Sequence, residues 1–318
     1  MGVFLGIDVG SVSTNVAVLR ENGAVLFTEY LRTRGDPRRA VLEGLALTRA
    51  GLDGHGPVIG VGTTGSARRF AGVLVGADLV KNEIIAHAAA AIHLYPDVST
   101  VLEIGGQDSK LIVIRDGVVV DFAMNTVCAA GTGSFLDQQA FRLGISIEAF
   151  GDYAARSRNK VTIASKCTVF AESDMIHKAQ LGTPTEDIIA GLCDGIVRNY
   201  LNNVGKGKRI ESRVVFQGGV AHNRGVVEAF RRELGMDITI PDCRGEMGAV
   251  GAALLVRRQF VRRSAPSSFL GFDVADIEFE PRVFDCEHCP NRCEVVELRR
   301  AGDVVDRYGH RCTRWDLA

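Results

Sequence analysis

One pattern occurs twice in this chain and limits its fold more than any other feature. In residues 3–19 an apolar strand ends in Asp8, runs into a glycine-containing turn and is followed by a second strand. In residues 100–114 an apolar strand ends in Glu103, 95 positions after Asp8, and continues into the same kind of turn and strand. Hairpins are common, and two of them can be similar by coincidence. In both of these, however, the strand-end acid is followed at once by a glycine-containing turn, which favours a duplicated unit.

Each copy also ends in a turn signal. Asn22-Gly23 predicts a type I′ hairpin, and Asp116-Gly117 marks the equivalent turn of the second copy after a one-residue gap. Duplicated lobes that face each other across a cleft are suited to holding a nucleotide. Backbone N–H groups at glycine-rich turns bind phosphate, and carboxylates at the strand ends hold Mg²⁺ through water.

The rest of the chain alternates between extended and helical patterns, which is typical of an α/β fold. Strands are predicted at 58–61, 213–216 and 237–240, and helices near 38–50, 83–94, 133–143, 146–156, 168–181, 186–203, 224–234 and 248–258. Gly218-Gly219 follows one of these strands and opens a helix, so it is a third candidate contact for phosphate or adenosine.

Composition excludes several classes of protein. The 318 residues carry 37 Lys and Arg against 38 Asp and Glu, a net charge of −1, which argues against a nucleic-acid binder with a basic surface. Apolar residues make up 46% of the chain, but no apolar run reaches the length of a membrane span. The first residues lack a signal-peptide pattern, so we expect a cytoplasmic protein.

Eight cysteines in such a chain favour metal ligation or catalysis over disulfides, because the cytosol keeps thiols reduced. Four of them fall within 27 residues near the C-terminus: Cys286, Cys289, Cys293 and Cys312. This spacing predicts a metal site, for which zinc and a [4Fe-4S] cluster are both open. Unliganded cysteines are the remaining alternative.

Five segments carry a resemblance to a known family: residues 6–11 (GIDVGS), 104–110 (IGGQDSK), 128–133 (CAAGTG), 167–173 (CTVFAES) and 218–223 (GGVAHN). With them, residues 1–257 resemble the acetate kinase/Hsp70/actin superfamily. Within it they resemble the BadF/BadG/BcrA/BcrD family, which includes ATP-dependent activators of 2-hydroxyacyl-CoA dehydratases and benzoyl-CoA reductases. The resemblance implies two ribonuclease-H-like lobes around an ATP cleft. It also implies a homodimer that shares one [4Fe-4S] cluster and uses ATP to drive a low-potential electron into a partner enzyme.

The same resemblance implies roles for individual residues. Asp8 and Glu103 orient Mg²⁺, Glu103 standing where many relatives have Asp and reaching the ion through water. Gln107 positions the attacking water, and Cys128 and Cys167 hold the bridging cluster. The implied nucleotide-binding residues are Gly10, Ser11, Ser13, Thr14, Gly105, Gly106, Asp108, Gly218, Gly219 and Asn223.

The sequence around Cys128 and Cys167 supports the cluster independently. Each cysteine precedes a predicted helix that ends at a glycine, Gly144 or Gly182, and a helix N-terminus stabilises a thiolate and the negative charge of a cluster. A cubane needs four thiolates, so two chains around a two-fold axis would supply them. The alternative is a pair of buried core cysteines.

We expect a first lobe at 1–96, rejoined by the last helix at about 246–262, and a second lobe at 97–245 that contains the cluster cysteines. A linker and cysteine-rich tail follow at 264–318. Compact activators of the family stop before this tail, which resembles the one in the very long activase-like members. An electron-transfer protein has a use for a relay, which slightly favours iron–sulfur over zinc in the tail.

The predicted function is therefore an ATP-dependent, oxygen-sensitive iron–sulfur activator. Ferredoxin or flavodoxin would reduce it, and its acceptor would be a dehydratase, a benzoyl-CoA-type reductase or a double-cubane protein. One alternative is a sugar or acyl-group kinase of the same superfamily, which has no use for Cys128 and Cys167. Another is a nucleotide-dependent regulator with structural zinc in its tail.

Overall fold

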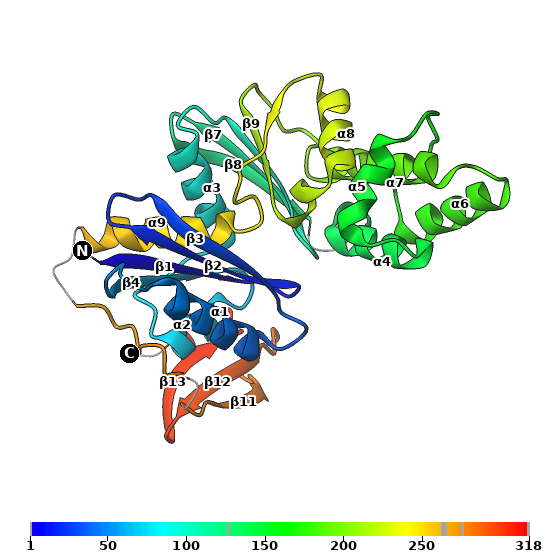
Figure 1. Ribbon diagram of the computed structural model, residues 1–318. Coiled ribbons are helices and arrows are strands. Elements are labelled where there is room, and N and C mark those ends of the chain that lie inside the picture. The colour runs from blue at the N-terminus through cyan, green and yellow to red at the C-terminus, as the bar shows by residue number, and fades with distance from the viewer. Residues whose placement is uncertain (1, 126–127, 262–265, 275–276, 317–318) are drawn as a thin grey trace.

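Two five-stranded sheets with the same topology form the framework of the computed structural model, which describes residues 2–125, 128–261, 266–274 and 277–316 (Figure 1). Sheet A has the strand order β3-β2-β1-β4-β5, and sheet B has the order β10-β9-β6-β7-β8. In each sheet three antiparallel strands are followed by two that run parallel to the first of them. The duplicated unit and the α/β class are thereby confirmed.

The first strand of each unit is buried along its whole length, because helices cover both faces of its sheet. The strands of sheet A are β1 (Val3–Val9), β2 (Ser13–Arg20), β3 (Val25–Arg32), β4 (Val58–Thr64) and β5 (Leu79–Val80). Those of sheet B are β6 (Thr100–Ile104), β7 (Ser109–Arg115), β8 (Val118–Asn125), β9 (Val214–Gln217) and β10 (Ile238–Thr239).

The two hairpin turns differ. At Asp116-Gly117 both residues have positive φ angles, 52° and 71°, as a type I′ turn requires. At the first hairpin Gly23 has a φ of 90° but Asn22 lies in ordinary backbone, and the N–H of Gly23 donates to the carbonyl of Arg20. The type I′ turn predicted at Asn22-Gly23 is therefore wrong, because this loop has one more residue than the two of a type I′ hairpin.

Helices lie between the sheets and on their outer faces (Figure 1). Between the sheets, and in one apolar core with both, lie α3 (Glu83–Leu94) and α9 (Met247–Phe260). The outer face of sheet A is covered by α1 (Pro37–Gly51) and α2 (Arg68–Val75). The core on the outer face of sheet B contains α4 (Gly133–Leu143), α5 (Ile147–Ala155), α6 (Thr168–Gln180), α7 (Thr185–Asn203) and α8 (Arg224–Leu234). None of the helices in the described ranges is long and apolar enough to cross a membrane.

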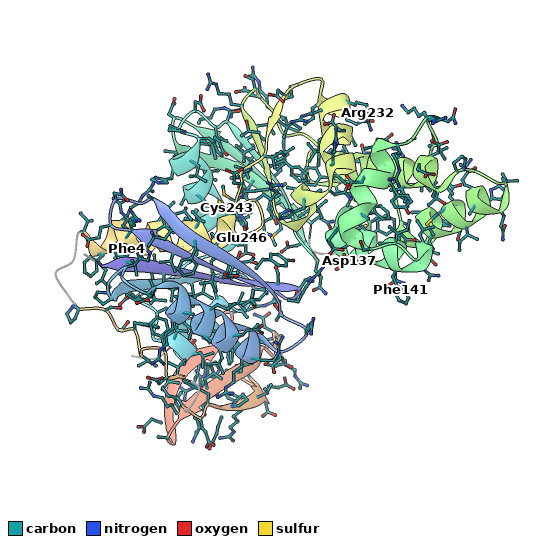
Figure 2. All side chains as sticks on the ribbon, in the orientation of Figure 1. Phe4, Asp137, Phe141, Arg232, Cys243 and Glu246 are labelled. Atoms are coloured by element: carbon teal, nitrogen blue, oxygen red, sulfur yellow. The ribbon has the colours of Figure 1, made fainter. Side chains whose placement is uncertain are left out.

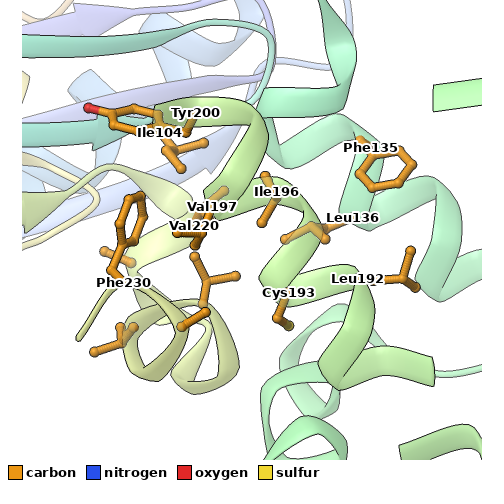
Figure 3. Packing of buried hydrophobic residues seen from close by; sticks show 14 of the residues in the cluster. Ile104, Phe135, Leu136, Leu192, Cys193, Ile196, Val197, Tyr200, Val220 and Phe230 are labelled. Carbon is orange, nitrogen blue, oxygen red and sulfur yellow. The ribbon is translucent and has the colours of Figure 1, made fainter. Parts of the chain in front are cut away.

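Helix α7 is central to the core outside sheet B (Figure 3). Its apolar face includes Ile196 and Val197, and the ring of its Tyr200 packs edge-on against Phe230 of α8, with centroids 5.3 Å apart. The hydroxyl of Tyr200 donates to the carbonyl of Lys110 on β7 at 2.6 Å. The helix is thus hydrogen-bonded directly to sheet B, in which the turn at residues 105–108 is the second predicted phosphate-binding loop (the second phosphate loop).

Helix α9 lies on sheet A with its backbone almost in contact with the strands. A Cβ atom on Gly6 of β1 would overlap the carbonyl oxygen of Ala249, and one on Gly62 of β4 would lie 2.5 Å from the carbonyl oxygen of Ala252. On the other side of α9, a Cβ on Gly251 would overlap the carbonyl oxygen of Ala86 in α3. The small residues of α9 therefore serve close packing between sheet A and α3.

The C-terminal tail forms a three-stranded antiparallel sheet, β11 (Glu280–Asp285), β12 (Glu294–Arg300) and β13 (Asp303–Tyr308). The expected linker begins at residues 264–265, which lie outside the described residues, but Ser267 and Ser268 both donate to the Asp78 carboxylate at 2.6–3.0 Å. Arg69 of α2 forms two hydrogen bonds with Asp306 of β13. The tail is therefore attached to the outer side of sheet A (Figure 1).

The close approach of α9 and α3 gives a stability prediction. Gly251→Ala forces a methyl group into the Ala86 carbonyl, so we expect a loss of about 3 kcal/mol in the free energy of unfolding. Gly195→Ala in the middle of α7 is the matched control, because its nearest neighbouring atom lies 3.8 Å away and alanine favours helix. Urea titration of both variants measures the difference. Equal stabilities would contradict the packing argument.

Candidate functional site

The two repeated loops face each other across a cleft that contains a cavity of about 110 Å³. The cavity lies where β1 and β6 end, so the duplicated fold places both strand-end acids in its wall. The residues predicted from the sequence that line it are Asp8, Gly10, Ser11, Ser13, Glu103, Gly105, Gly106, Gln107, Asp108, Gly218 and Gly219.

Thr14 does not reach this cavity. Its side chain is fully buried, and its hydroxyl is 3.0 Å from the hydroxyl of Thr33. Side chains alternate along a strand, so Ser13 and Asn15 face the cleft and Thr14 faces the other side of β2. The assignment of Thr14 as a nucleotide contact is therefore not supported by its position.

The two loops are closed by the same hydrogen bond. The N–H of Gly10 donates to the carbonyl of Ser13 at 2.8 Å, and the N–H of Gly105 donates to the carbonyl of Asp108 at 3.0 Å. Asp8 is further enclosed by glycine, since a Cβ on Gly248 of α9 would overlap its carboxylate. The start of α9 thus limits the space open to the Asp8 carboxylate.

Each strand-end acid is flanked by polar residues on the neighbouring strands. Asp8 pairs in register with Asn15 and Thr64, whereas Glu103 pairs with Lys110 and Gln217. Burial raises the pKa of Asp8 to about 6 and that of Glu103 to about 7, and the nearby Lys110 ammonium opposes both shifts. The two carboxyls are therefore held close to their protonation equilibrium near neutral pH.

Lys110 lines the same cavity, and our sequence analysis did not assign it a role. Its ammonium lies 3.0 Å from Glu103 Oε2 and 2.7 Å from Asp108 Oδ1, and its side chain is only 4% exposed. These carboxylates raise its pKa above the ordinary value, so it stays charged. The only signal in the sequence is its place seven residues after Glu103, equivalent to Asn15 after Asp8.

His87 of α3 also lines the cleft. Burial lowers its pKa to about 3, so the ring is neutral. Its Nδ1 accepts a hydrogen bond from Gln217 Nε2 at 2.8 Å, which assigns the ring proton to Nε2. Because His87 lies in an alanine-rich helix, the sequence gives no indication that it lines the cleft.

Polar atoms around the two strand-end acids would suit a hydrated divalent cation, and of the three residues that supply them Asn15 lines the cavity whereas Thr64 and Gln217 do not. Asn15 Oδ1, Thr64 Oγ1 and Gln217 Oε1 are buried oxygen atoms with no hydrogen-bond partner, and each belongs to a residue that pairs with Asp8 or Glu103. Unpaired buried oxygens next to carboxylates are the donors that Mg²⁺ and its water ligands require. Asp8 and Glu103, with these oxygens around them, are therefore the residues that would hold the ion.

A second cavity of about 510 Å³ shares Gly105, Gly106 and Gly219 with the first. Its wall includes Asp137 of α4, and Glu246 at the start of α9 (Figure 2). Asn223 also lines it, but its Oδ1 caps α8 by accepting from Val226 N, which leaves its unpartnered Nδ2 as the group available to a ligand. This cavity has the size and position for the nucleoside part of ATP.

Cys128 and Cys167 both lie directly before helices and are partly exposed. Cys128 precedes the short 3-10 helix η1 (Ala129–Gly131) that leads into α4, and Cys167 is the N-cap of α6. Asn199 of α7 lies between the two segments. Its Nδ2 donates to Ser165 O at 2.5 Å, and its Oδ1, which accepts from Asn203 Nδ2, would be 2.7 Å from a Cβ on Gly131. The side chain is thus hydrogen-bonded to the segment before Cys167 and packs against the segment after Cys128.

Within one chain these thiols do not complete a metal site. Among the residues that the structure describes, no three His, Cys, Asp or Glu side chains form a group that could hold a metal ion. The four tail cysteines, Cys286, Cys289, Cys293 and Cys312, line a separate cavity. Cys193 is buried in α7, and burial raises its pKa to about 12, so it is a core thiol.

The raised carboxyl pKa values predict how stability depends on pH. The folded chain keeps protons on Asp8 and Glu103 at pH values where the unfolded chain has lost them. Loss of these protons should lower the free energy of unfolding of the nucleotide-free chain by about 4 kcal/mol as the pH rises from about 5 to 8. His87 acts in the opposite direction, because its lowered pKa keeps it neutral in the folded chain while it is protonated in the unfolded chain at pH 5, so the net fall should be about 2 kcal/mol. Urea titrations test this. Glu103→Gln should make the dependence shallower, and an unchanged slope would contradict the assignment.

Removal of the buried ammonium gives a second prediction. Lys110→Met leaves Glu103 without its cation, so its pKa rises further and the carboxyl is protonated at neutral pH. Binding of Mg²⁺ with a fluorescent ATP analogue should weaken by about tenfold or more, and less so at higher pH. Lys208→Met, which removes an exposed ion pair with Asp121, is the control. Unchanged affinity for Lys110→Met would show that the ammonium is dispensable.

Comparison with known proteins places this site in a family. Residues 5–256 match the BadF/BadG/BcrA/BcrD ATPase family. The (R)-2-hydroxyglutaryl-CoA dehydratase activating ATPase of Acidaminococcus fermentans is 35% identical over 256 residues, 79% of this chain and 95% of that protein. The crystal structure of (R)-2-hydroxyglutaryl-CoA dehydratase component A from Acidaminococcus fermentans has a TM-score of 0.75 at 33% identity, covering 82% of this chain and 100% of that one.

A nucleotide-bound structure is also similar. The activator of the 2-hydroxyisocaproyl-CoA dehydratase from Clostridium difficile, with bound ADPNP, has a TM-score of 0.74 at 31% identity, covering 82% of this chain and 96% of that one. The family match includes both phosphate loops, Cys128 and Cys167, and ends before the tail. The chain has the acetate kinase/Hsp70/actin fold and belongs to the BadF/BadG/BcrA/BcrD ATPase family.

Proposed function

We propose that this chain is an ATP-dependent activator that works as a homodimer around one [4Fe-4S] cluster and passes a low-potential electron to a partner enzyme. The observation that carries the proposal is a hydrogen-bonded connection from the second phosphate loop to the Cys128 segment. The N–H of Gly133 donates to Gly105 O at 2.8 Å, and the Ser134 hydroxyl donates to Gly106 O at 2.6 Å. A loop that moves with the nucleotide therefore moves the start of α4.

The connection continues to the thiols through short segments. Thr132 separates α4 from η1, and its N–H and hydroxyl both bond Ala129 O, at 3.0 and 2.8 Å. Asn125 brackets Cys128, accepting from its N–H at 3.0 Å and donating to its carbonyl at 2.8 Å. A displacement at Gly105-Gly106 thus reaches Cys128 through a chain of hydrogen bonds and no long flexible loop.

The exposed surface of α4 and α6 supports a second copy as the partner that completes the cluster. Five large apolar side chains there are exposed to solvent: Phe141 (81%), Val169 (65%), Phe170 (66%), Ile176 (42%) and Leu181 (67%). Val169 and Phe170 follow Cys167 directly, and Phe141 points away from the body of the molecule (Figure 2). Apolar surface of this kind beside a pair of thiols is suited to an interface that buries it.

In this proposal each group of residues has a defined task. Asp8 and Glu103 hold Mg²⁺, the loops at Gly10 and Gly105 bind the phosphates, and Gln107 orients the water that attacks the γ-phosphate. Cys128 and Cys167 of two chains supply four thiolates, and a cluster bound there supplies one-electron transfer at low potential. Ferredoxin or flavodoxin would be the donor.

The acceptor follows from the relatives. Dehydratases of 2-hydroxyacyl-CoA are the enzymes named for the Acidaminococcus and Clostridium proteins, so the proposed acceptor is an iron–sulfur dehydratase or a related reductase or double-cubane protein. Nucleotide exchange would alternate the dimer between two arrangements, which changes the environment of the cluster and the docking surface together.

The decisive test is anaerobic metal analysis of the purified chain. We expect about two irons and two sulfides per chain in a dimer, since one four-iron cluster is shared. Cys128→Ser/Cys167→Ser should lose this iron, whereas Cys243→Ser, a half-buried thiol away from α4 and α6, should keep it. Both cysteines are partly exposed, so air should bleach the wild-type cluster.

Two outcomes would overturn the proposal. Absence of iron from every anaerobic preparation would remove the electron-transfer role and favour a kinase. An iron content per chain that is the same in Cys128→Ser/Cys167→Ser as in the wild type would place the cluster elsewhere. Additional iron that survives in this variant while the rest is lost would belong to the tail cysteines. ATP hydrolysis measured on the same samples separates loss of the nucleotide site from loss of the cluster.

A further inference from the structure

The C-terminal tail has too small an apolar core to hold its fold by burial alone. Between residues 280 and 316 the apolar side chains that are more than nine-tenths buried are Cys286, Val295 and Leu298. Units of below about 40 residues usually depend on disulfides, metals or association for stability. The tail cysteines are free thiols, so no disulfide among them stabilises the sheet, and the small apolar core contributes little.

The four tail cysteines lie at one end of the tail sheet. Cys286 follows the last residue of β11, and Cys293 precedes the first residue of β12. These two strand ends are adjacent, because Asp285 pairs with Glu294, and the N–H of Cys286 donates to Cys293 O at 2.8 Å. Cys289 lies in the loop between them.

Cys312 comes to the same end from β13. Tyr308 at the end of β13 pairs with Val296 near the start of β12, so the chain leaves β13 beside the β11–β12 loop. All four cysteines line one cavity of about 620 Å³. In the metal-free chain no three potential ligands of the described residues lie close enough to hold an ion. Cys286 and Cys293 are fixed by the strands, whereas Cys289 and Cys312 are exposed and have room to turn inward.

Two histidines line this cavity beside the cysteines, and the ring of one of them, His288, packs against the ring of Trp315 with centroids 6.2 Å apart. His310 is unsuited as a ligand, because its Nδ1 lies 2.8 Å from Cys312 O and its Nε2 lies 3.1 Å from Arg307 O. Those contacts instead position the Cys312 segment. Four thiolates around a divalent ion carry a net charge of 2−, and Arg311 and Arg314, which line the cavity, offset it.

We propose that Cys286, Cys289, Cys293 and Cys312 form a tetrathiolate metal centre that joins the β11–β12 loop to the segment after β13. Binding one divalent ion releases the four thiol protons and leaves each sulfur bound to the metal. Zinc and iron share this ligand chemistry, so metal analysis distinguishes them. The centre uses residues outside the matched family region and does not depend on the proposed dimer cluster.

The experiment uses the full-length chain with Cys128→Ser/Cys167→Ser, so that a dimer cluster does not contribute metal. We expect about one zinc or iron per chain, or about four irons with sulfide if the centre is a cluster. Adding Cys289→Ser/Cys312→Ser should remove this metal, whereas adding Cys243→Ser should not. The loss of metal should also make β11–β13 exchange amide hydrogens about tenfold faster or more, which mass spectrometry measures.

Cobalt titration distinguishes the loss of a metal ligand from misfolding of a variant. Co²⁺ added to the metal-free chain should develop the intense visible and near-ultraviolet bands of tetrahedral cobalt–thiolate coordination, with up to four protons released per ion. Weaker bands in each single Cys→Ser variant would assign the ligands one by one. The proposal is overturned if the metal-free chain gives no such bands, or if anaerobic preparations with the tail intact contain no tail metal.

Discussion

The cleft depends on how closely the backbone of α9 approaches sheet A. Glycines on β1 and β4 allow the helix to lie against the strands, and a glycine at its start leaves room for the Asp8 carboxylate. The same helix packs on α3, so one segment sets the spacing between the two sheets and the shape of the cleft floor. A larger side chain at any of these contacts would separate the layers. The geometry of the phosphate loops therefore follows from packing that is remote from the loops in sequence.

The second phosphate loop is hydrogen-bonded to the segment that follows Cys128, whereas the carbonyls of Gly10 and Val12 in the first loop accept from Thr33. The backbone carbonyls of the second loop accept from the first residues of α4, and α4 follows the segment that contains Cys128. Asn199 packs against that segment and donates a hydrogen bond to Ser165 in the segment before Cys167. Short hydrogen bonds and close packing both transmit a displacement. The proposed coupling between nucleotide and thiols uses this part of the second lobe, while the first lobe closes the cleft.

Much of this architecture follows from the sequence, because strand periodicity and glycine turns are local signals. The repeat, the acids one residue before the ends of β1 and β6, and the helices that follow Cys128 and Cys167 all lie close to where local patterns place them. The residues that the sequence analysis missed owe their position to contacts between elements far apart in the chain or on neighbouring strands. Lys110 matters because β7 holds it beside Glu103, and His87 because α3 faces Gln217. The first hairpin and Thr14 show the limits of motif reasoning, since one extra loop residue and the alternation of β2 decide them. The tail strands escaped too, because their pattern is largely exposed.

The unequal partners of the two acids have a consequence for symmetry. Two identical half-length chains around a two-fold axis would place the same residues beside both acids, so that a cation would lie beside both or beside neither. One chain with two unequal halves is free of this restriction. Lys110 lies beside Glu103, whereas the uncharged Asn15 holds the equivalent position beside Asp8. The two walls of the cleft therefore differ in charge although their sheets share one topology.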